Sequence, residues 1–314
     1  MSPTVLVVGS LHYDMMVAAP RLPHLGETLP GNAWSSKCGG KGGNQAVEAA
    51  RHGARSVMIG CVGPDEMGAK LLENLASSGV DTDHVRTTDV GSGLSVVVSE
   101  AAGDYAAVIV SGANQHLQES DLTAADALVA AARVLVLQNE IPDAVNVAAA
   151  ARGRRVGALI VWNAAPARPS EALLGLVDVL VVNAIEAEMF GTAAVADLAS
   201  AAAAAAVLGA RVPTAIVTAG GDGVAWCEAG LAHRIEPHKV KLVSTHGAGD
   251  AFIGALAARL AYGAPMQDAI AYANAAAAAL VSTPEHSRST LTPADVERIL
   301  ASGDPAPGAA LQPS

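Results

Sequence analysis

The sequence predicts an α/β protein with a doubly wound, mostly parallel β-sheet flanked by helices, and with a small β-sheet lid. Three observations lead to this fold class. Short runs of β-branched and aliphatic residues are apolar throughout, which is typical of strands buried on both faces of a parallel sheet. Alanine-rich stretches with high helix propensity separate these runs. Two further regions contain strand-like segments with no long helix between them.

The strands of the large sheet are expected at regular places along the chain. They occupy residues 5–8, 56–59, 134–137, 158–161, 177–182 and 214–217. The alanine-rich segments between them, including the runs at 201–206 and 275–279, are expected to be helices that cover the sheet.

The lid is predicted from residues 26–37 and 93–110, where strand-like segments are alternating or flanked by polar residues. They look like a small antiparallel layer inserted into the larger unit, so we place the lid near residues 12–37 and 93–112. The Pro/Gly-rich tail, residues 303–314, is expected to be disordered.

Composition excludes several classes of protein. The 314 residues carry a formal net charge of −11 and no run rich in Lys and Arg. Such a chain lacks the electrostatic footprint of nucleic-acid binding and would be repelled by an anionic membrane. The three cysteines, Cys38, Cys61 and Cys227, are too few and too scattered for a disulfide framework or a CxxC metal site, so a reducing compartment fits best.

We expect a soluble, cytoplasmic protein. Residues 1–10 have no basic segment or cleavage pattern and are interpreted as leading into a first strand, not as a signal peptide. The richest apolar stretches, residues 198–210 and 275–281, fall short of the roughly 18 to 20 residues that a membrane span requires.

The most informative segment, residues 243–254, follows a strand-like run and opens an apolar helix predicted over residues 251–260. Gly247 and Gly249 leave backbone N–H groups bare at a helix N-terminus, where the amides and the helix dipole favour an anion such as phosphate. Asp250 adds a carboxylate beside the same spot. An anion site with an adjacent base suits phosphoryl transfer to a hydroxyl, although Asp250 could instead only complement the helix dipole.

A second glycine-rich segment covers residues 38–46 and precedes a helix predicted over residues 45–52. Its spacing does not match a Walker A loop. Consecutive glycines here suggest backbone brought close to a small polar ligand, with Asn44 as helix cap and hydrogen-bonding group. The alternative is a tight strand-to-helix turn without a ligand.

Polar residues also follow several predicted strands, where an open parallel sheet binds its ligands. Asp14 and Glu140 are two such acids, and either could also be a solvated loop residue. Asn183 and Glu186 at a helix start could orient Mg²⁺-bound waters or only cap the helix. The glycine-rich turn at residues 218–223 could approach a nucleotide or be an ordinary hairpin turn.

Two kinds of site are disfavoured by missing motifs. The first predicted strand is not followed by G-x-G-x-x-G, the motif that would have been the main evidence for a nicotinamide-dependent oxidoreductase. The nine histidines show no HxxxH or HExxH spacing, so a dedicated transition-metal site is not expected.

Taken in order and spacing, six segments resemble those of the ribokinase-like (PfkB) carbohydrate kinases over roughly residues 4 to 300. The joint occurrence of the segments around Lys41 and Asp250 is highly specific. The six segments are Gly26-Glu-Thr, Gly39-Gly40-Lys41-Gly42-Gly43-Asn44, Gly63-Pro-Asp65-Glu-Met-Gly68, Asn163-Ala-Ala-Pro-Ala-Arg168, Asn183-Ala-Ile-Glu186 and Gly247-Ala-Gly-Asp250.

The resemblance implies a single kinase domain over residues 1–302 with a β-sheet lid that often mediates dimerisation, and hence a homodimer. It implies transfer of the γ-phosphate of MgATP to a primary hydroxyl of a small sugar, with ribose the leading candidate. By position, Asp250 would accept the hydroxyl proton. The amides of Ala248, Gly249 and Asp250, next to Gly247, would form the anion hole for the phosphoryl group.

The remaining site residues are likewise implied by position. Those that would bind the sugar are His12, Asp14, Gly40, Lys41, Asn44 and Glu140. Those that would border the nucleotide are Asn183, Thr218, Gly220, Gly223 and Asn274. Glu186, with Asn183, would organise Mg²⁺ through water.

The chain departs from the family pattern at two places. His12 stands where the family usually has Asn and is followed by bulky Tyr13, so a nucleoside, a hexose or a modified keto-sugar is an alternative substrate. Ser244 and Glu285 alter both halves of the site where the family holds an activating K⁺, so we predict weak or absent K⁺ activation. A catalytically silent sugar- or nucleotide-binding regulator is a further alternative, against which the intact Asp250 and its glycines argue.

Overall fold

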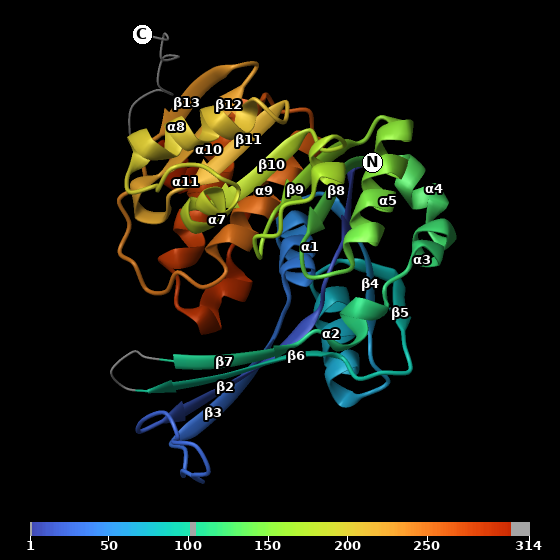
Figure 1. The fold of residues 1–314 in the computed structure, drawn as a ribbon, viewed down its shortest axis with the longest axis vertical. Coiled ribbons are helices and arrows are strands. Elements are labelled where there is room, and N and C mark those ends of the chain that lie inside the picture. Colours follow the sequence, from blue (N-terminus) through green and yellow to red (C-terminus); the bar gives the residue numbers. More distant parts are fainter. Residues whose placement is uncertain (1, 101–104, 303–314) are drawn as a thin grey trace.

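The computed structural model describes residues 2–100 and 105–302, and the predicted disordered tail lies outside them. A nine-stranded sheet has the order β13-β12-β11-β10-β9-β8-β1-β4-β5 (Figure 1). β12 pairs antiparallel with both of its neighbours, β11 and β13, and all the other neighbouring strands pair in parallel. The strands are β1 Thr4–Val8, β4 Arg55–Val62, β5 Asp81–Thr87, β8 Ala132–Gln138, β9 Leu159–Asn163, β10 Val179–Asn183, β11 Thr214–Thr218, β12 Val224–Glu228 and β13 Leu231–Ile235.

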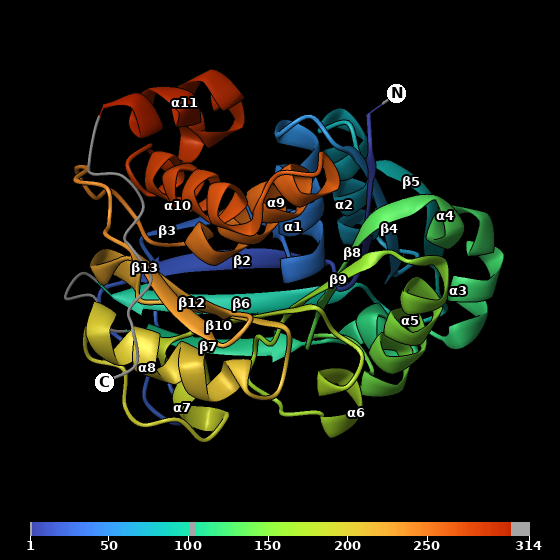
Figure 2. The ribbon, with the colours of Figure 1, turned by 90° about the horizontal axis from the view of Figure 1, so that it is seen from above.

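Helices cover both faces of this sheet, as Figure 2 shows, so the predicted doubly wound α/β class is confirmed. Alternate residues of β1 point to opposite layers, with Leu6 in one apolar core and Val7 in the other. One face carries α1 Lys41–Arg51, α2 Glu66–Ser77, α9 Ala248–Ala261, α10 Met266–Val281 and α11 Pro293–Ala301. The other carries α3 Glu119–Ala124, α4 Asp126–Ala131, α5 Asp143–Val156, α6 Glu171–Leu174, α7 Ala184–Met189 and α8 Leu198–Gly209.

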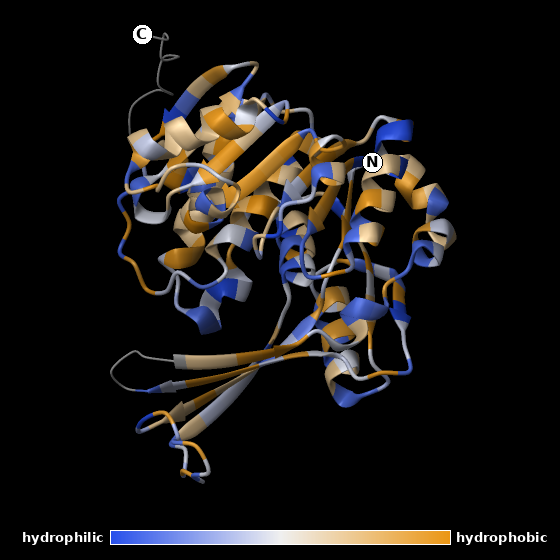
Figure 3. Ribbon diagram, viewed as in Figure 1, coloured by the Kyte–Doolittle hydropathy of each residue, from blue (hydrophilic) through white to orange (hydrophobic). Residues whose placement is uncertain are grey.

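All six predicted strands of the large sheet are present, and Figure 3 shows the apolar character of central strands such as β10 and β11. Three strands of this sheet, β5, β12 and β13, lie outside the predicted set. β5 has the sequence DTDHVRT and lies at an edge, where one side of the strand lacks a neighbour and polar residues are tolerated. An edge strand of this kind carries no continuous apolar run, so the pattern that identified the others could not find it.

The lid is a separate four-stranded sheet of order β3-β2-β6-β7, which extends beneath the helices in Figure 1. It consists of β2 His12–Ala19, β3 Ala33–Gly39, β6 Gly93–Glu100 and β7 Tyr105–Val110, so the predicted segments are confirmed. The prediction that the layer is antiparallel was wrong in one respect, because β2 and β6 pair in parallel. Each of them continues from a strand of the large sheet, β1 and β5, and those two strands run in the same direction.

Helix α1 begins earlier than predicted. Its first residue is Lys41 and its N-cap is Gly40, at a φ of 87° that favours glycine, so Asn44 lies inside the helix and is not the cap. The glycines of the segment allow this early start. A Cβ on Gly42 would lie 2.6 Å from the backbone nitrogen of Ser10, so only glycine lets the first turn pack against the chain that leaves β1.

The described residues lack both a membrane-spanning helix and a preformed metal cluster. In the part of the chain that the structure describes, none of the helices has the length and hydropathy that crossing a membrane would require. Across residues 2–100 and 105–302, no group of three or more His, Cys, Asp or Glu side chains is arranged to hold a metal ion.

Candidate active site

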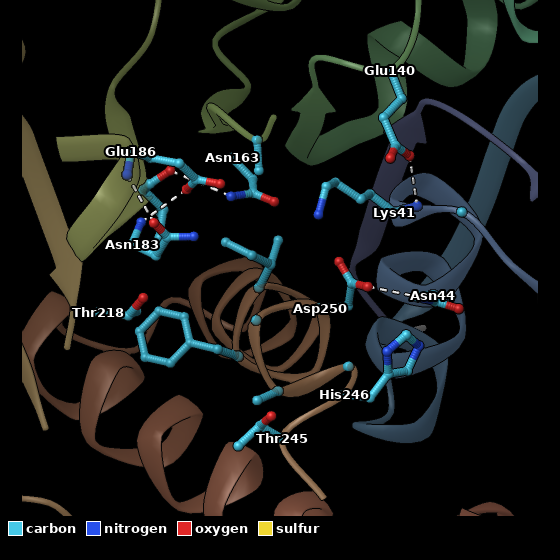
Figure 4. Close-up of a pocket in the computed structure, with 18 of the residues that line it drawn as sticks. Lys41, Asn44, Glu140, Asn163, Asn183, Glu186, Thr218, Thr245, His246 and Asp250 are labelled. Carbon is cyan, nitrogen blue, oxygen red and sulfur yellow. Dashed lines mark hydrogen bonds between the residues drawn. The ribbon is translucent and has the colours of Figure 1, made fainter. Parts of the chain in front are cut away.

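A cavity of about 350 Å³ lies at the carboxyl ends of the parallel strands, between the large sheet and the lid (Figure 4). Four side chains mark that edge of the sheet, Thr218 of β11, Asn183 of β10, Asn163 of β9 and Glu140 just after β8. The order of the strands reverses at the neighbouring strand β1, which pairs with β8 on one side and β4 on the other. Open α/β sheets bind ligands at this kind of switch point.

The structure brings most of the predicted site residues together around this cavity. Those that line it are His12, Asp14, Gly40, Lys41, Asn44, Glu140, Asn183, Glu186, Thr218, Gly247, Ala248, Gly249 and Asp250. Figure 4 places Lys41, Asn44 and Glu140 on one side of Asp250, and Asn183 and Thr218 on the other. The cavity therefore has two halves that meet at Asp250.

The carboxylate of Asp250 is held by two side-chain amides. Asn44 Nδ2 donates to Oδ2 at 2.9 Å and Gln45 Nε2 donates to Oδ1 at 2.9 Å. Burial raises the pKa of Asp250, while the Lys41 ammonium and the two amide donors oppose that rise. The carboxylate is thus fixed in direction and made more basic than a solvated aspartate, which suits a group that accepts a proton.

Gln45 is a site residue that the sequence analysis missed. Its side chain is fully buried, and its Nε2 also donates to Asn163 Oδ1 at 3.0 Å. Its Oε1 accepts from Gln138 Nε2 at 2.8 Å, which fixes the orientation of the amide. One feature of the sequence could have identified Gln45. It directly follows the glycine-rich segment and shares a buried helix face with Ala46 and Ala49, where a polar side chain needs a hydrogen-bond partner.

The N-terminus of α9 has the features of an anion site. Gly247 is its N-cap at a φ of 81°, and the N–H groups of a first helical turn have no acceptor within the helix. The Ala248 N–H donates to Thr245 O at 3.2 Å, so the amides of Gly249 and Asp250 are the better placed to bind an anion. A Cβ built on Gly249 meets no described atom within 4 Å, so this glycine leaves the cavity open above the helix end.

Asp14 reaches the cavity from the lid, inside the region 12–37 predicted for that layer. It lies within lid strand β2, opposite Lys37 of β3, and not in a loop beyond the first strand of the large sheet. The chain needs only three residues between β1 and β2, so the lid begins almost where the sheet ends. Burial raises the pKa of Asp14 to about 6, against the lowering effect of the Lys37 charge.

His12 and Glu140 share the inner end of the same half of the cavity. Glu140 Oε2 accepts from Ser10 Oγ and from the backbone N–H of Lys41, the latter at 3.0 Å, and His12 Nδ1 lies 3.7 Å from it. Burial lowers the pKa of His12, and its Nε2 lies 3.3 Å from Asn114 Nδ2. An oriented imidazole whose pKa favours the neutral form therefore faces the cavity.

The expectation that Tyr13 reshapes the pocket was wrong. Side chains alternate along β2, so Tyr13 points away from the cavity that its neighbours His12 and Asp14 line. Its hydroxyl lies 2.6 Å from Ser36 Oγ, and Lys70 of α2 lies over its ring.

Asn183 and Glu186 form a capping box at the start of α7. Asn183 Oδ1 accepts from the Glu186 N–H at 2.8 Å, and Glu186 Oε2 accepts from the Asn183 N–H at 2.9 Å. The capping hydrogen bond uses Oε2 of Glu186, so Oε1 is left to bind a ligand. Burial raises the pKa of this carboxyl group. A single carboxylate oxygen suits Mg²⁺, which keeps several waters and takes other ligands from phosphates, so the residues fit a water-mediated Mg²⁺ site.

Three predicted nucleotide-site residues lie outside the cavity lining. Gly220 and Gly223 belong to the turn between β11 and β12, where a Cβ on Gly223 would lie 2.3 Å from the carbonyl oxygen of Ile235. Asn274 lies in α10 and donates from Nδ2 to Glu236 O at 3.3 Å. These residues shape the hairpin and the segment that follows β13.

The lid adds cavity residues that were not predicted. Ser95 of β6 and Ile109 of β7 pair with each other in register, and Ser95 also pairs with Asp14. Thr245, His246 and other residues near α9 complete the lining. Only the strand pairing, which the sequence does not reveal, shows that Ser95 and Ile109 share a face with Asp14.

Comparison with known proteins gives a consistent result. The family model described as pfkB family carbohydrate kinase matches residues 2–293. A ribokinase of Haemophilus influenzae is 34% identical over 285 residues, which are 90% of this chain and 93% of that protein. A ribokinase of Mus musculus is 36% identical over 264 residues, 82% of each chain. The structure of Arabidopsis thaliana ribokinase complexed with ribose and ATP superposes with a TM-score of 0.87 at 28% identity, covering 96% of this chain and 99% of that one.

Proposed function

The chain belongs to the pfkB family of carbohydrate kinases, and we propose that it transfers the γ-phosphate of ATP to a primary hydroxyl of ribose. The observation that carries this proposal is the carboxylate of Asp250, held by Asn44 and Gln45 beside the free amides at the start of α9. A base and an anion site within one helical turn are the two groups that phosphoryl transfer to an alcohol needs. The ribokinases among its relatives support ribose as the acceptor.

Asp250 accepts the proton of the sugar hydroxyl while that oxygen attacks the γ-phosphorus. The bond from the γ-phosphorus to the β,γ-bridging oxygen breaks, and ADP leaves with the electron pair. Because the transition state is loose, the protein contributes mainly position and charge, and no covalent intermediate with the protein is needed. The amides of Gly249 and Asp250 stabilise the negative charge on the transferring group.

Local groups must bind ATP, because the net charge of −11 opposes a polyanionic ligand. The positive end of α9 and the Lys41 side chain supply favourable charge within the cavity. Glu186 and Asn183 would hold Mg²⁺ through its waters. When bound, Mg²⁺ neutralises charge on the phosphate oxygens.

The acceptor half of the cavity supplies hydrogen bonds in place of aromatic stacking. Asp14 and Glu140 offer carboxylate oxygens to sugar hydroxyls, and His12 adds a neutral imidazole. Aromatic residues make up only 3% of the chain. This polar lining suits a small polyhydroxylated acceptor.

ADP release measured with a panel of pentoses, hexoses and nucleosides tests the proposal. Ribose is expected to give the highest kcat/KM. If a hexose, a keto-sugar or a nucleoside is the best acceptor, the protein is still a kinase but ribose is not its substrate. If ATP and sugar bind by calorimetry and no acceptor is turned over, the chain is instead a silent binding protein.

We also propose that a second copy of the chain covers the lid face that turns away from the cavity. Val108 and Trp34 lie on that face and are 67% and 70% exposed. Large exposed apolar side chains on a sheet favour association, and a self-complementary face gives a two-fold dimer.

Light scattering tests this dimer. The wild-type protein is expected at twice the mass of one chain, and Val108→Lys at the mass of one, because the new charge would be buried at the interface. Val207→Lys, at a 55% exposed position on α8, is the matched control and should leave the mass unchanged. A wild-type mass of one chain would contradict the proposal.

We place the catalytic unit in one domain over residues 1–302, since the cavity draws on residues from β2 through α9. We place the protein in the cytoplasm, which is consistent with its three free cysteines.

A further inference from the structure

The guanidinium of Arg288 is bound by three backbone carbonyl oxygens from two separate segments. Nη1 donates to His246 O at 2.7 Å, Nη2 donates to Ser244 O at 2.9 Å, and Nε donates to Thr283 O at 3.1 Å. The side chain is only 12% exposed. A guanidinium carries its N–H donors in a fixed planar fork, so three carbonyl acceptors on three different nitrogens hold the side chain in one orientation.

The two segments joined by Arg288 both support the anion site. Ser244 and His246 lie just before Gly247, the N-cap of α9, and Thr283 follows the end of α10. The connection is reinforced by the backbone N–H groups of Val243 and Ser244, which both donate to Val281 O. Arg288 therefore crosslinks the segment that leads into α9, whose first turn carries the Gly249 and Asp250 amides, to the segment that follows α10.

A carboxylate completes the surroundings of the guanidinium. Glu285 Oε1 lies 3.9 Å from Arg288 Nη1 and accepts from Ser244 Oγ at 3.3 Å. Its Oε2 lies 3.6 Å from Lys37 Nζ of lid strand β3. Glu285 thus links the Arg288 cluster to the lid.

Carbonyl oxygens converging with a carboxylate form the donor set that proteins use for hard cations. The family resemblance implies a monovalent-cation site where Ser244 and Glu285 stand. In this chain the donors do not fit a free ion, because a guanidinium already uses three of the carbonyls and brings a permanent positive charge.

We propose that Arg288 is a built-in replacement for a bound monovalent cation, and that it positions the anion hole of α9. Arg288 is a positioning residue, since it acts through the backbone of residues 244–247. The inference rests on the proposed kinase function. It explains in physical terms why the K⁺ dependence of this chain should be weak.

The first experiment needs no variant. Turnover of the wild-type protein with ribose and MgATP is measured in K⁺, Na⁺, Cs⁺ and choline chloride at equal ionic strength. The rates are expected to agree within about two-fold, and the melting temperature should be the same in KCl and choline chloride, because a ligand stabilises a protein only where it binds the folded state. A many-fold K⁺ stimulation, or a rise in melting temperature specific to K⁺, would overturn the proposal.

The second experiment removes the guanidinium. Arg288→Ala is expected to lower kcat by roughly 100-fold with little change in the sugar KM, since small misplacements of catalytic groups have effects of this size. Added guanidinium or K⁺ should restore part of the rate and raise the melting temperature of this variant but not of the wild type. Arg288→Lys, which keeps the charge but cannot span three carbonyls, should retain more activity than Arg288→Ala.

Arg298→Ala is the matched control, because Arg298 is exposed and pairs with Asp295 on α11. It should change neither kcat nor the response to cations. If Arg288→Ala keeps the wild-type kcat, or loses it with no rescue by either cation, the proposal is wrong. Failure of the kinase function itself is distinguishable, because then the wild-type protein would phosphorylate no acceptor in any salt.

Discussion

Asp250→Asn is expected to lower kcat by roughly 10²- to 10⁴-fold, the usual contribution of a general base, while leaving ATP affinity nearly unchanged. The carboxylate is the group placed to accept the hydroxyl proton, and an amide cannot accept it. In the proposed binding mode, ATP would contact the helix amides and the half of the cavity lined by Asn183 and Thr218, which this substitution leaves in place. Steady-state kinetics with ribose and calorimetry with a non-hydrolysable ATP analogue measure the two quantities.

The control for this variant concerns the local fold. An asparagine keeps one acceptor oxygen but turns an N–H group toward either Asn44 or Gln45, which both donate to Asp250. Asp250→Ala, which presents no donor, should lose the same activity. Asp126→Asn, at an exposed position on α4, should behave as the wild type. If Asp250→Asn retains the wild-type kcat, Asp250 is not the base and the proposed mechanism is wrong.

Gly249→Ala is expected to reduce kcat by roughly 100-fold, about the effect of losing one oxyanion-hole donor. A Cβ at this position has no described atom within 4 Å, so the chain can accommodate the methyl group in its folded state. Because Gly249 lines the cavity, the methyl would extend into the space that the phosphoryl group would occupy in the proposed mechanism.

The same substitution should raise the free energy of unfolding by about 0.5–1 kcal/mol, because alanine is the better helix former. A variant that is more stable and much less active separates a site role from a folding role. Gly175→Ala is the control and should keep full activity, because Gly175 lies beyond α6 and a Cβ there would meet its nearest neighbour, the carbonyl oxygen of Ala172, at an ordinary 3.8 Å. Unchanged kcat in Gly249→Ala would show that no phosphate approaches this helix end.

The large sheet was predictable because burial on both faces imposes an unbroken apolar run on each central strand. Runs such as residues 5–8 and 214–217 became β1 and β11. Edge strands do not need such a run. β5 lies at the edge of the sheet, where its polar residues are partly exposed, so its sequence carries no continuous apolar segment. The fold class therefore followed from the central strands alone.

Local signals at helix starts were informative about chemistry and less so about boundaries. The glycines of residues 38–46 indicated close backbone approach, yet the helix begins at Lys41. What decided the boundary was the contact of Gly42 with the backbone at Ser10, a residue 32 positions away in the chain. No local pattern carries that information.

Residue type and short spacing were enough to predict the parallel sheet, the glycine-rich start of α9 and the acid beside it. The tertiary structure alone decided which distant groups complete the site. Asp14 and Ser95 are neighbours because β2 pairs with β6, and Gln45 donates a hydrogen bond to Asp250. Arg288 donates to carbonyl oxygens that lie more than 40 positions away in the chain. The physical reason is that hydrogen bonds and strand register are set by distances in space, whereas a sequence pattern records only the burial and backbone preference of each segment.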